Sequence, residues 1–79
     1  MEQIKKAAKN RLTPETDGTW SIKPLLKLKA LTTDDRGGRF FKKGNMVDAD
    51  FLAGPEYKHP LTVHLTVGYW WKIDMFELP

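Results

Sequence analysis

The sequence predicts an α+β domain, in which an N-terminal helix accompanies a small antiparallel sheet of about four strands. Three observations lead to this prediction. Apolar residues recur at helical spacing near the start, shorter stretches alternate apolar and polar residues, and a long alternating stretch lies near the end. With 79 residues, the chain is long enough for one domain, residues 1–79, and too short for two.

The first segment, residues 1–13, is predicted to be a helical arm. Ile4, Ala8 and Leu12 follow one another at four-residue spacing and are surrounded by lysine and arginine, which is typical of an amphipathic helix. Pro14 favours extended geometry in the residue before it and therefore ends the helix. The dipeptide at 17–18, Asp-Gly, indicates a turn.

Residues 19–43 are predicted to form a basic β-hairpin. In the first strand, apolar residues alternate with Lys27 and Lys29, so that one face is apolar and the other cationic. Pro24 marks the start, an edge or a bend of this strand because proline cannot donate to the sheet. The loop TTDDRGGR then leads into a second strand over 39–43.

Residues 45–53 fit two structures. As a helix, the segment has an N-cap in Asn45, a stop in Gly54 and a block to continuation in Pro55. As a strand, it alternates apolar and acidic residues over 47–51. The stop signal favours a short helix, and the strand remains the alternative.

Residues 61–76 alternate strictly and are predicted to form one long strand. Sixteen residues at ~3.3 Å each would span ~53 Å, whereas a domain of this length is about 30 Å across. The strand therefore has to bend, and Gly68 is the expected bend point. A tight hairpin is rejected here because Tyr69 and Trp70 are poor turn residues. The expected core comprises Leu26, Leu28, Val63, Leu65, Val67 and Trp71.

The composition excludes several classes of site. The chain has no cysteine, so it forms neither disulfides nor thiolate metal sites, and its two histidines argue against structural zinc. No cofactor is predicted. Apolar runs fall short of the ~18 residues of a membrane span, and the N-terminus lacks the apolar core of a signal peptide. We therefore expect a soluble, cytoplasmic protein.

The net charge of +3 is distributed unevenly. Residues 1–43 contain eleven lysines and arginines against five acidic residues, which gives +6, and residues 44–79 contain two against five, which gives −3. A basic half favours an acidic partner such as nucleic acid, and the acidic half could contact a basic protein or a second copy of the chain.

The first candidate site is a nucleic-acid interface on the basic hairpin. Cations would neutralise phosphates, and Phe40 would stack on a base. The cations are Lys27, Lys29, Arg36, Arg39, Lys42 and Lys43. The alternative is an ordinary lysine-rich strand edge that discourages aggregation.

The second candidate is a protein interface on the outer face of the long strand, formed by Trp70, Lys72, Asp74 and Phe76. Exposed tryptophan beside polar residues is typical of an interface anchor. The partner would be a target protein, bound by a small regulator or inhibitor of the kind that phages and mobile elements encode. A homodimer through residues 69–76 is a further hypothesis, since a projecting strand edge is a template for a second copy. The alternative is that the N-terminal helix covers this face.

Catalytic signatures are weak. Ser21 is the only serine, and His64 and Asp74 would lie roughly 33 Å apart along an extended strand. The acidic pairs at 34–35 and at 48 and 50 match no recognised cation loop. The sequence thus predicts a non-catalytic binding protein, with nucleic acid as the first partner and a target protein as the alternative.

Overall fold

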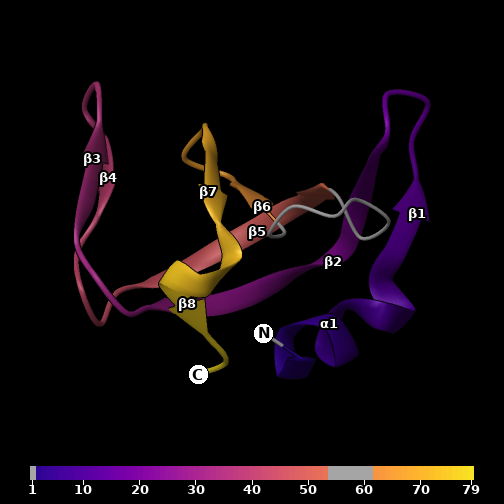
Figure 1. Ribbon diagram of the computed structural model, residues 1–79, viewed down its shortest axis with the longest axis horizontal. Coiled ribbons are helices and arrows are strands. Elements are labelled where there is room, and N and C mark those ends of the chain that lie inside the picture. Colours follow the sequence, from indigo (N-terminus) through magenta and orange to yellow (C-terminus); the bar gives the residue numbers. More distant parts are fainter. Residues whose placement is uncertain (1, 54–61) are drawn as a thin grey trace.

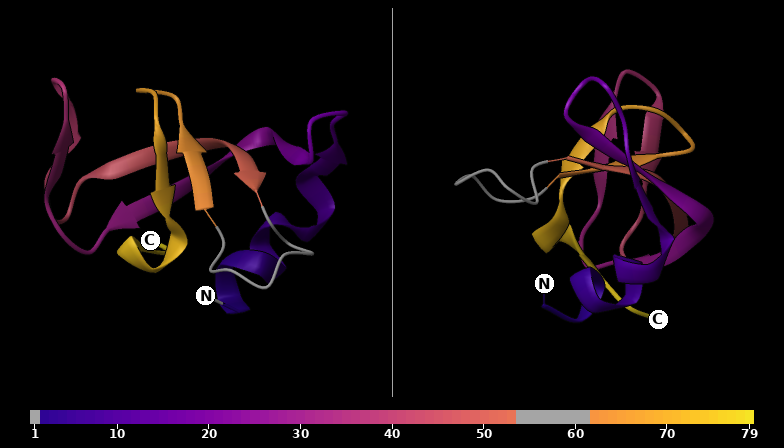
Figure 2. Two further views of the ribbon diagram at one scale, coloured as in Figure 1. Left: turned by 45° about the horizontal axis from the view of Figure 1, so that its top comes forward. Right: turned by 90° about the vertical axis from the view of Figure 1, so that its right-hand side faces the viewer.

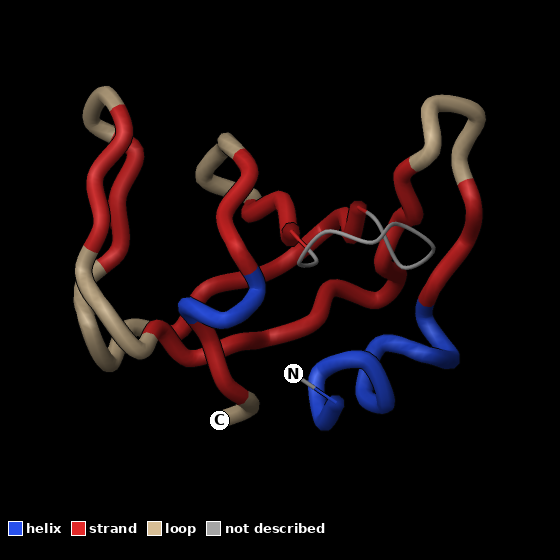
Figure 3. The backbone as a smooth tube through the Cα atoms, in the orientation of Figure 1, coloured by secondary structure: helices blue, strands red, loops and turns tan. Residues whose placement is uncertain are grey.

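The computed structural model describes residues 2–53 and 62–79, and its principal-axis extents are 29 × 25 × 25 Å. Strands dominate the described residues, in which helix is confined to the start and to one turn near the end (Figure 3). In chain order the elements are α1 (Glu2–Ala8), η1 (Lys9–Arg11), β1 (Leu12–Pro14), β2 (Thr19–Ala30), β3 (Asp34–Arg36), β4 (Arg39–Phe41), β5 (Met46–Ala53), β6 (Thr62–Leu65), β7 (Trp70–Lys72), η2 (Ile73–Met75) and β8 (Phe76–Glu77) (Figure 1). The 3-10 helices carry the label η.

One six-stranded antiparallel sheet and one separate hairpin make up the fold. The strand order of the sheet is β1-β2-β5-β6-β7, β8 pairs with β2, and β3 pairs with β4. Because β7 leads through η2 into β8, the chain returns to β2 and the sheet curls back toward its own start. The predicted antiparallel sheet is confirmed, but the protein is mostly β, with more strands than the four expected.

The N-terminal helix is shorter than the arm predicted over 1–13. The α-helix ends at Ala8, a 3-10 turn follows, and Leu12 already begins β1. Ile4 and Ala8 are buried against the sheet as their spacing predicts. The Arg11 guanidinium donates to the Leu25 carbonyl at 2.9 Å, which ties the end of the helical segment to β2. In the described ranges, no helix is long and apolar enough to cross a membrane.

The long, bent strand of this protein is β2. Its ladder with β5 shifts register between Ser21 and Leu26, on either side of Pro24, so the proline lies at an irregularity within β2 and not at the start of the strand. The pairing predicted for residues 19–43 is wrong, because β2 pairs with β5 and not with 39–43. Hydrogen bonds from Ala30 to Asn45 and from Gly44 to Ala30 return the chain to β2 only after the separate β3–β4 hairpin.

Residues 46–53 form a strand, so the helix favoured for 45–53 is wrong. As β5, this segment lies between β2 and β6, where Ala49 and Leu52 are fully buried. The three-residue step between these two inward positions is produced by a register shift between Ala49 and Phe51. The stop signal at 54–55 lies outside the described residues.

The predicted single strand over 61–76 is also wrong, because it folds back on itself as a tight hairpin. Residue 61 lies outside the described residues, and β6 and β7 are joined through a turn in which Gly68 donates to the Leu65 carbonyl at 2.8 Å. Gly68 has φ +111° and Tyr69 has φ +64°. The glycine supplies the positive φ that other residues adopt reluctantly, and the Tyr69 ring is held under the Arg39 guanidinium at 5.2 Å.

The core agrees with five of the six residues predicted for it. Val67 is the exception, with 44% exposure, because it lies in the β6–β7 turn. Phe76, predicted to be an outer interface residue, is only 4% exposed and packs on Phe41 with ring centroids 5.0 Å apart. The five confirmed residues are Leu26, Leu28, Val63, Leu65 and Trp71.

Three hairpin turns lie along one side of the molecule (Figure 1). The β1–β2, β3–β4 and β6–β7 turns point to the same side, and α1 lies at the opposite end (Figures 1 and 2). The outer face of the sheet beside these turns is the surface that the next subsection describes.

Candidate functional site

Three ring side chains form a row on the outer face of the sheet. Phe51 of β5 is paired in register with His64 of β6, and His64 with Trp70 of β7. The His64 ring meets the Trp70 ring at a centroid distance of 5.2 Å and the Phe51 ring at 6.0 Å. All three are half-buried, so each ring keeps part of its surface open to solvent.

The irregularity in β5 brings a carboxylate to the same row. Asp50 occupies the extra position between Ala49 and Phe51, and such a bulge redirects side chains locally. His64 Nδ1 donates to Asp50 Oδ1 at 2.8 Å, which fixes the orientation of the imidazole. The acidic partner of His64 is therefore Asp50, and not the Asp74 that the sequence analysis considered.

The β1–β2 turn presents a second carboxylate. Gly18 has φ +86°, and the Glu15 amide donates to the Thr19 carbonyl at 2.9 Å. Asp17 Oδ1 accepts from the Thr19 hydroxyl at 2.6 Å and from the Thr19 amide at 3.0 Å. These bonds hold the pKa of Asp17 below its ordinary value, and the bond from the Thr19 hydroxyl is the largest cause. The group is therefore an anion at neutral pH.

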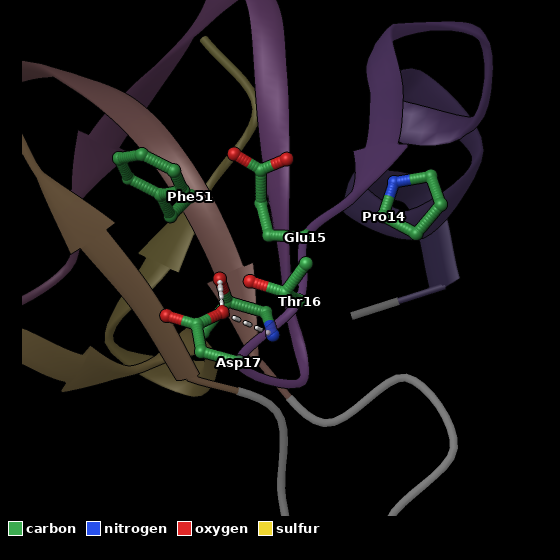
Figure 4. Close-up of a pocket in the computed structure, with 6 residues that line it drawn as sticks. Pro14, Glu15, Thr16, Asp17 and Phe51 are labelled. Carbon is green, nitrogen blue, oxygen red and sulfur yellow. Dashed lines mark hydrogen bonds between the residues drawn. The ribbon is translucent and has the colours of Figure 1, made fainter.

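An open hollow of about 180 Å³ lies between the β1–β2 turn and the row of rings. We call it the aromatic hollow, and its described lining residues are Asp17, Thr19, Phe51, His64 and Trp70. An adjoining hollow of about 350 Å³ shares Asp17, Thr19 and Phe51 with it and extends along the turn (Figure 4). The adjoining hollow is completed by Pro14, Glu15 and Thr16. Because they share three lining residues, the two hollows lie next to each other, and together they are called the groove.

The two arginines predicted to bind phosphates, Arg36 and Arg39, make contacts with other residues of the protein. Arg36 donates to the Trp70 carbonyl at 3.2 Å, and its guanidinium lies 5.6 Å from the Trp71 ring centroid. Arg36 Nε is also 3.8 Å from the Asp34 carboxylate. Arg39 lies over Tyr69. Both side chains thus fasten the β3–β4 hairpin to the β6–β7 hairpin.

The four lysines predicted for the same interface are exposed but divided between two elements. Lys27 and Lys29 lie on β2. In the strand register, Lys27 is opposite Asp48 of β5 and Lys29 is opposite Glu77 of β8. Lys42 and Lys43 follow β4 at the base of the hairpin, where their amides donate to the side chains of Asn45 and Thr33. Phe40, on β4, is 51% exposed.

The residues predicted for a protein interface are only partly brought together. Trp70 lies on the outer face, and Lys72 follows two positions along β7 and is exposed, as is Asp74 in η2. Phe76 belongs to the core. No sequence pattern marked Asp17, Thr19, Asp50 or Phe51 as site residues, because only strand pairing brings residues so distant in sequence to one surface.

The single serine of the chain takes part in a hydrogen bond within the fold. Ser21 Oγ donates to the Thr13 carbonyl at 3.4 Å and is buried. Across residues 2–53 and 62–79, no group of three His, Asp or Glu side chains is arranged to hold a metal ion.

Comparison of the chain with protein-family models, with curated proteins and with solved structures gives no match.

Proposed function

We propose that the protein is a non-catalytic binding module that docks a partner protein on the outer face of β5, β6 and β7. One observation carries the proposal: the half-buried rings of Phe51, His64 and Trp70 line a hollow on this face. Aromatic side chains are enriched among the anchors of protein interfaces, where they contribute much of the binding free energy. A row of rings that already contact one another needs little further ordering when a partner covers it.

The contacts of the cations within residues 19–43 support a protein partner over nucleic acid. Arg36 and Arg39 are used in contacts within the protein, and Lys27 faces Asp48 across the β2–β5 ladder. Affinity for nucleic acid depends on cations that reach phosphates. Neighbouring carboxylates and contacts within the protein reduce the number of cations that can reach phosphates.

Affinity capture with two aromatic variants tests the proposal. Immobilised parent protein, Trp70→Leu and Phe40→Ala are each exposed to nuclease-treated lysate of the source cells, and the bound proteins are quantified. We expect a partner that the parent and Phe40→Ala retain and that Trp70→Leu loses. Leucine keeps an apolar side chain at a half-buried position, and thermal melts verify that both variants fold.

Two results would contradict the proposal. One is a partner that binds all three proteins equally, since the Trp70 ring would then contribute nothing. The other is a set of proteins that all three columns capture from untreated lysate and that none captures from nuclease-treated lysate, because nucleic acid would then have bridged them.

Nucleic acid is a second candidate, and the exposure of Phe40 favours it. At 51%, Phe40 is the most exposed of the described large hydrophobic side chains, and Lys42 lies two positions further on. If Lys27, Lys29, Lys42 and Lys43 all reach phosphates, log K should fall with log salt at a slope of about −3. Fluorescence anisotropy with labelled single strands measures this, and Phe40→Ala should weaken binding. Absence of binding at ~50 mM salt rejects this candidate.

A further inference from the structure

We propose that the aromatic hollow receives a cationic side chain, arginine or lysine, from an extended segment of the partner protein. This inference rests on the proposed function and specifies the chemistry of its site.

The size of the hollow suits one side chain. Sites for drug-sized molecules have volumes of roughly 300–1,000 Å³, and the aromatic hollow has about 180 Å³. The adjoining hollow runs past Glu15 and Asp17 along the β1–β2 turn (Figure 4). An extended peptide could therefore lie along the turn and insert one side chain between Asp17 and Trp70.

The charge around the groove favours a cation. Its described lining residues include the carboxylates of Glu15 and Asp17 and no lysine or arginine. Asp17 is ionised at neutral pH, and both of its bonds from Thr19 fall on Oδ1, so Oδ2 lies outside those bonds. The groove is thus acidic in a protein whose net charge is +3.

Ring faces and a carboxylate together are suited to a guanidinium or an ammonium. A cation within about 6 Å of an aromatic centroid is attracted by the ring quadrupole. This protein already makes such contacts internally, from Arg36 to Trp71 at 5.6 Å and from Arg39 to Tyr69 at 5.2 Å. Trp70, with Asp17 in the same lining, offers a similar combination to a partner.

The charge of Lys72 provides a test of whether the aromatic hollow prefers a cation or an anion. It is exposed on β7, two positions from Trp70, and is not among the described lining residues. A positive charge this close to the hollow opposes the entry of a cation and would assist an anion. Lys72→Gln should therefore strengthen the binding of a cationic probe and weaken that of an anionic one.

The experiment titrates the full chain with short peptides and follows backbone and indole NMR signals. The probe is acetyl-glycyl-arginyl-glycine amide, and its neutral match replaces arginine with citrulline, which has nearly the same shape. We expect the arginine peptide to produce saturable shifts at the Trp70 indole and the Thr19 amide, with a Kd of about 1 mM. The citrulline peptide should bind several-fold more weakly.

Variants then assign the binding to the hollow. Asp17→Asn and Trp70→Leu should each weaken the arginine peptide about fivefold or more, and Lys72→Gln should strengthen it. Asp35→Asn is the matched control, because Asp35 is an exposed acid on the β3–β4 hairpin. Equal binding of the two peptides, equal losses in the Asp17 and Asp35 variants, or the absence of saturable shifts would each overturn the inference.

The two proposals fail in different ways. If a Trp70-dependent partner is captured but Asp17→Asn retains it fully and the arginine peptide does not bind, the docking face stands and the cationic side chain is wrong. If the arginine peptide binds as expected but no Trp70-dependent partner is captured, the hollow is a cation site and the proposed function is wrong.

Discussion

Trp71 and Asp34, which lie 37 positions apart in the chain, are joined by a hydrogen bond from the indole Nε1 to the carboxylate Oδ2 at 3.1 Å. Trp71 is 1% exposed, so its indole N–H depends on this acceptor. We expect Asp34→Ala to lower the free energy of unfolding by about 1–3 kcal/mol, because a buried donor would be left without a partner. Denaturant melts measure the change.

Asp34→Asn is the matched variant for this prediction. The amide oxygen can still accept from the indole, so we expect a clearly smaller loss than in Asp34→Ala. If the alanine and asparagine variants lost the same stability, the charge interaction with Arg36, 3.8 Å away, would matter more than the bond to Trp71.

Gly68→Ala should destabilise the β6–β7 turn. Gly68 has φ +111°, and an added Cβ would lie 2.7 Å from Arg39 Cδ. The Arg39 side chain can move aside, but the backbone conformation is unfavourable for any L-residue with a side chain, at about 1–2 kcal/mol. Thermal unfolding checks this, and Gly38→Ala separates the two effects, because Gly38 has φ +87° and open space around it.

Leu65 and Val67 should respond differently to truncation, although both belong to the same alternating stretch. Leu65 is fully buried, whereas Val67 is 44% exposed in the turn. Leu65→Ala should cost ~2–5 kcal/mol, and Val67→Ala should stay within ~0.5 kcal/mol of the parent. Comparable losses in denaturant melts would mean that the strand continues past residue 66, as the alternation alone predicted.

Thr19→Val should raise the pKa of Asp17 toward its ordinary value, because the hydroxyl bond is the largest cause of the depression. The depressed pKa of Asp17 stabilises the folded protein at pH values above the pKa of the unfolded state, about 3.9. That contribution disappears as the pH falls through the pKa of the folded state. Carboxyl NMR titration of the parent and the variant measures both pKa values. The idea fails if the two titration curves coincide.

The homodimer hypothesis for residues 69–76 loses the feature on which it was based. The hypothesis depended on a projecting strand, whereas β6 and β7 fold back on each other and Phe76 is buried in the core. We therefore expect a monomer in light scattering at ~100 μM, well above the micromolar affinity of a modest specific interface. A dimeric parent and a monomeric Trp70→Ser would restore the hypothesis.

The sequence by itself determined the alternation of β2, the special position of Pro24, the helical stripe of Ile4 and Ala8, and the burial of Leu26, Leu28, Val63, Leu65 and Trp71. These features depend on the local period of apolar residues, which is two in a strand and 3.6 in a helix, and on the geometry of proline. The stop signal at 54–55 favoured a helix where β5 forms, because a helix boundary signal is local and does not show that strands lie on both sides.

Only the tertiary structure decided which strands pair and which side chains share a surface. Strict alternation over residues 61–76 is compatible with one strand or with two, and the choice depended on Gly68 and on the 29 Å length of the molecule. The aromatic hollow joins Asp17, Phe51 and Trp70 from three separate segments. No spacing in the sequence marks such a site, since contacts between paired strands depend on register, and register is set by the fold as a whole.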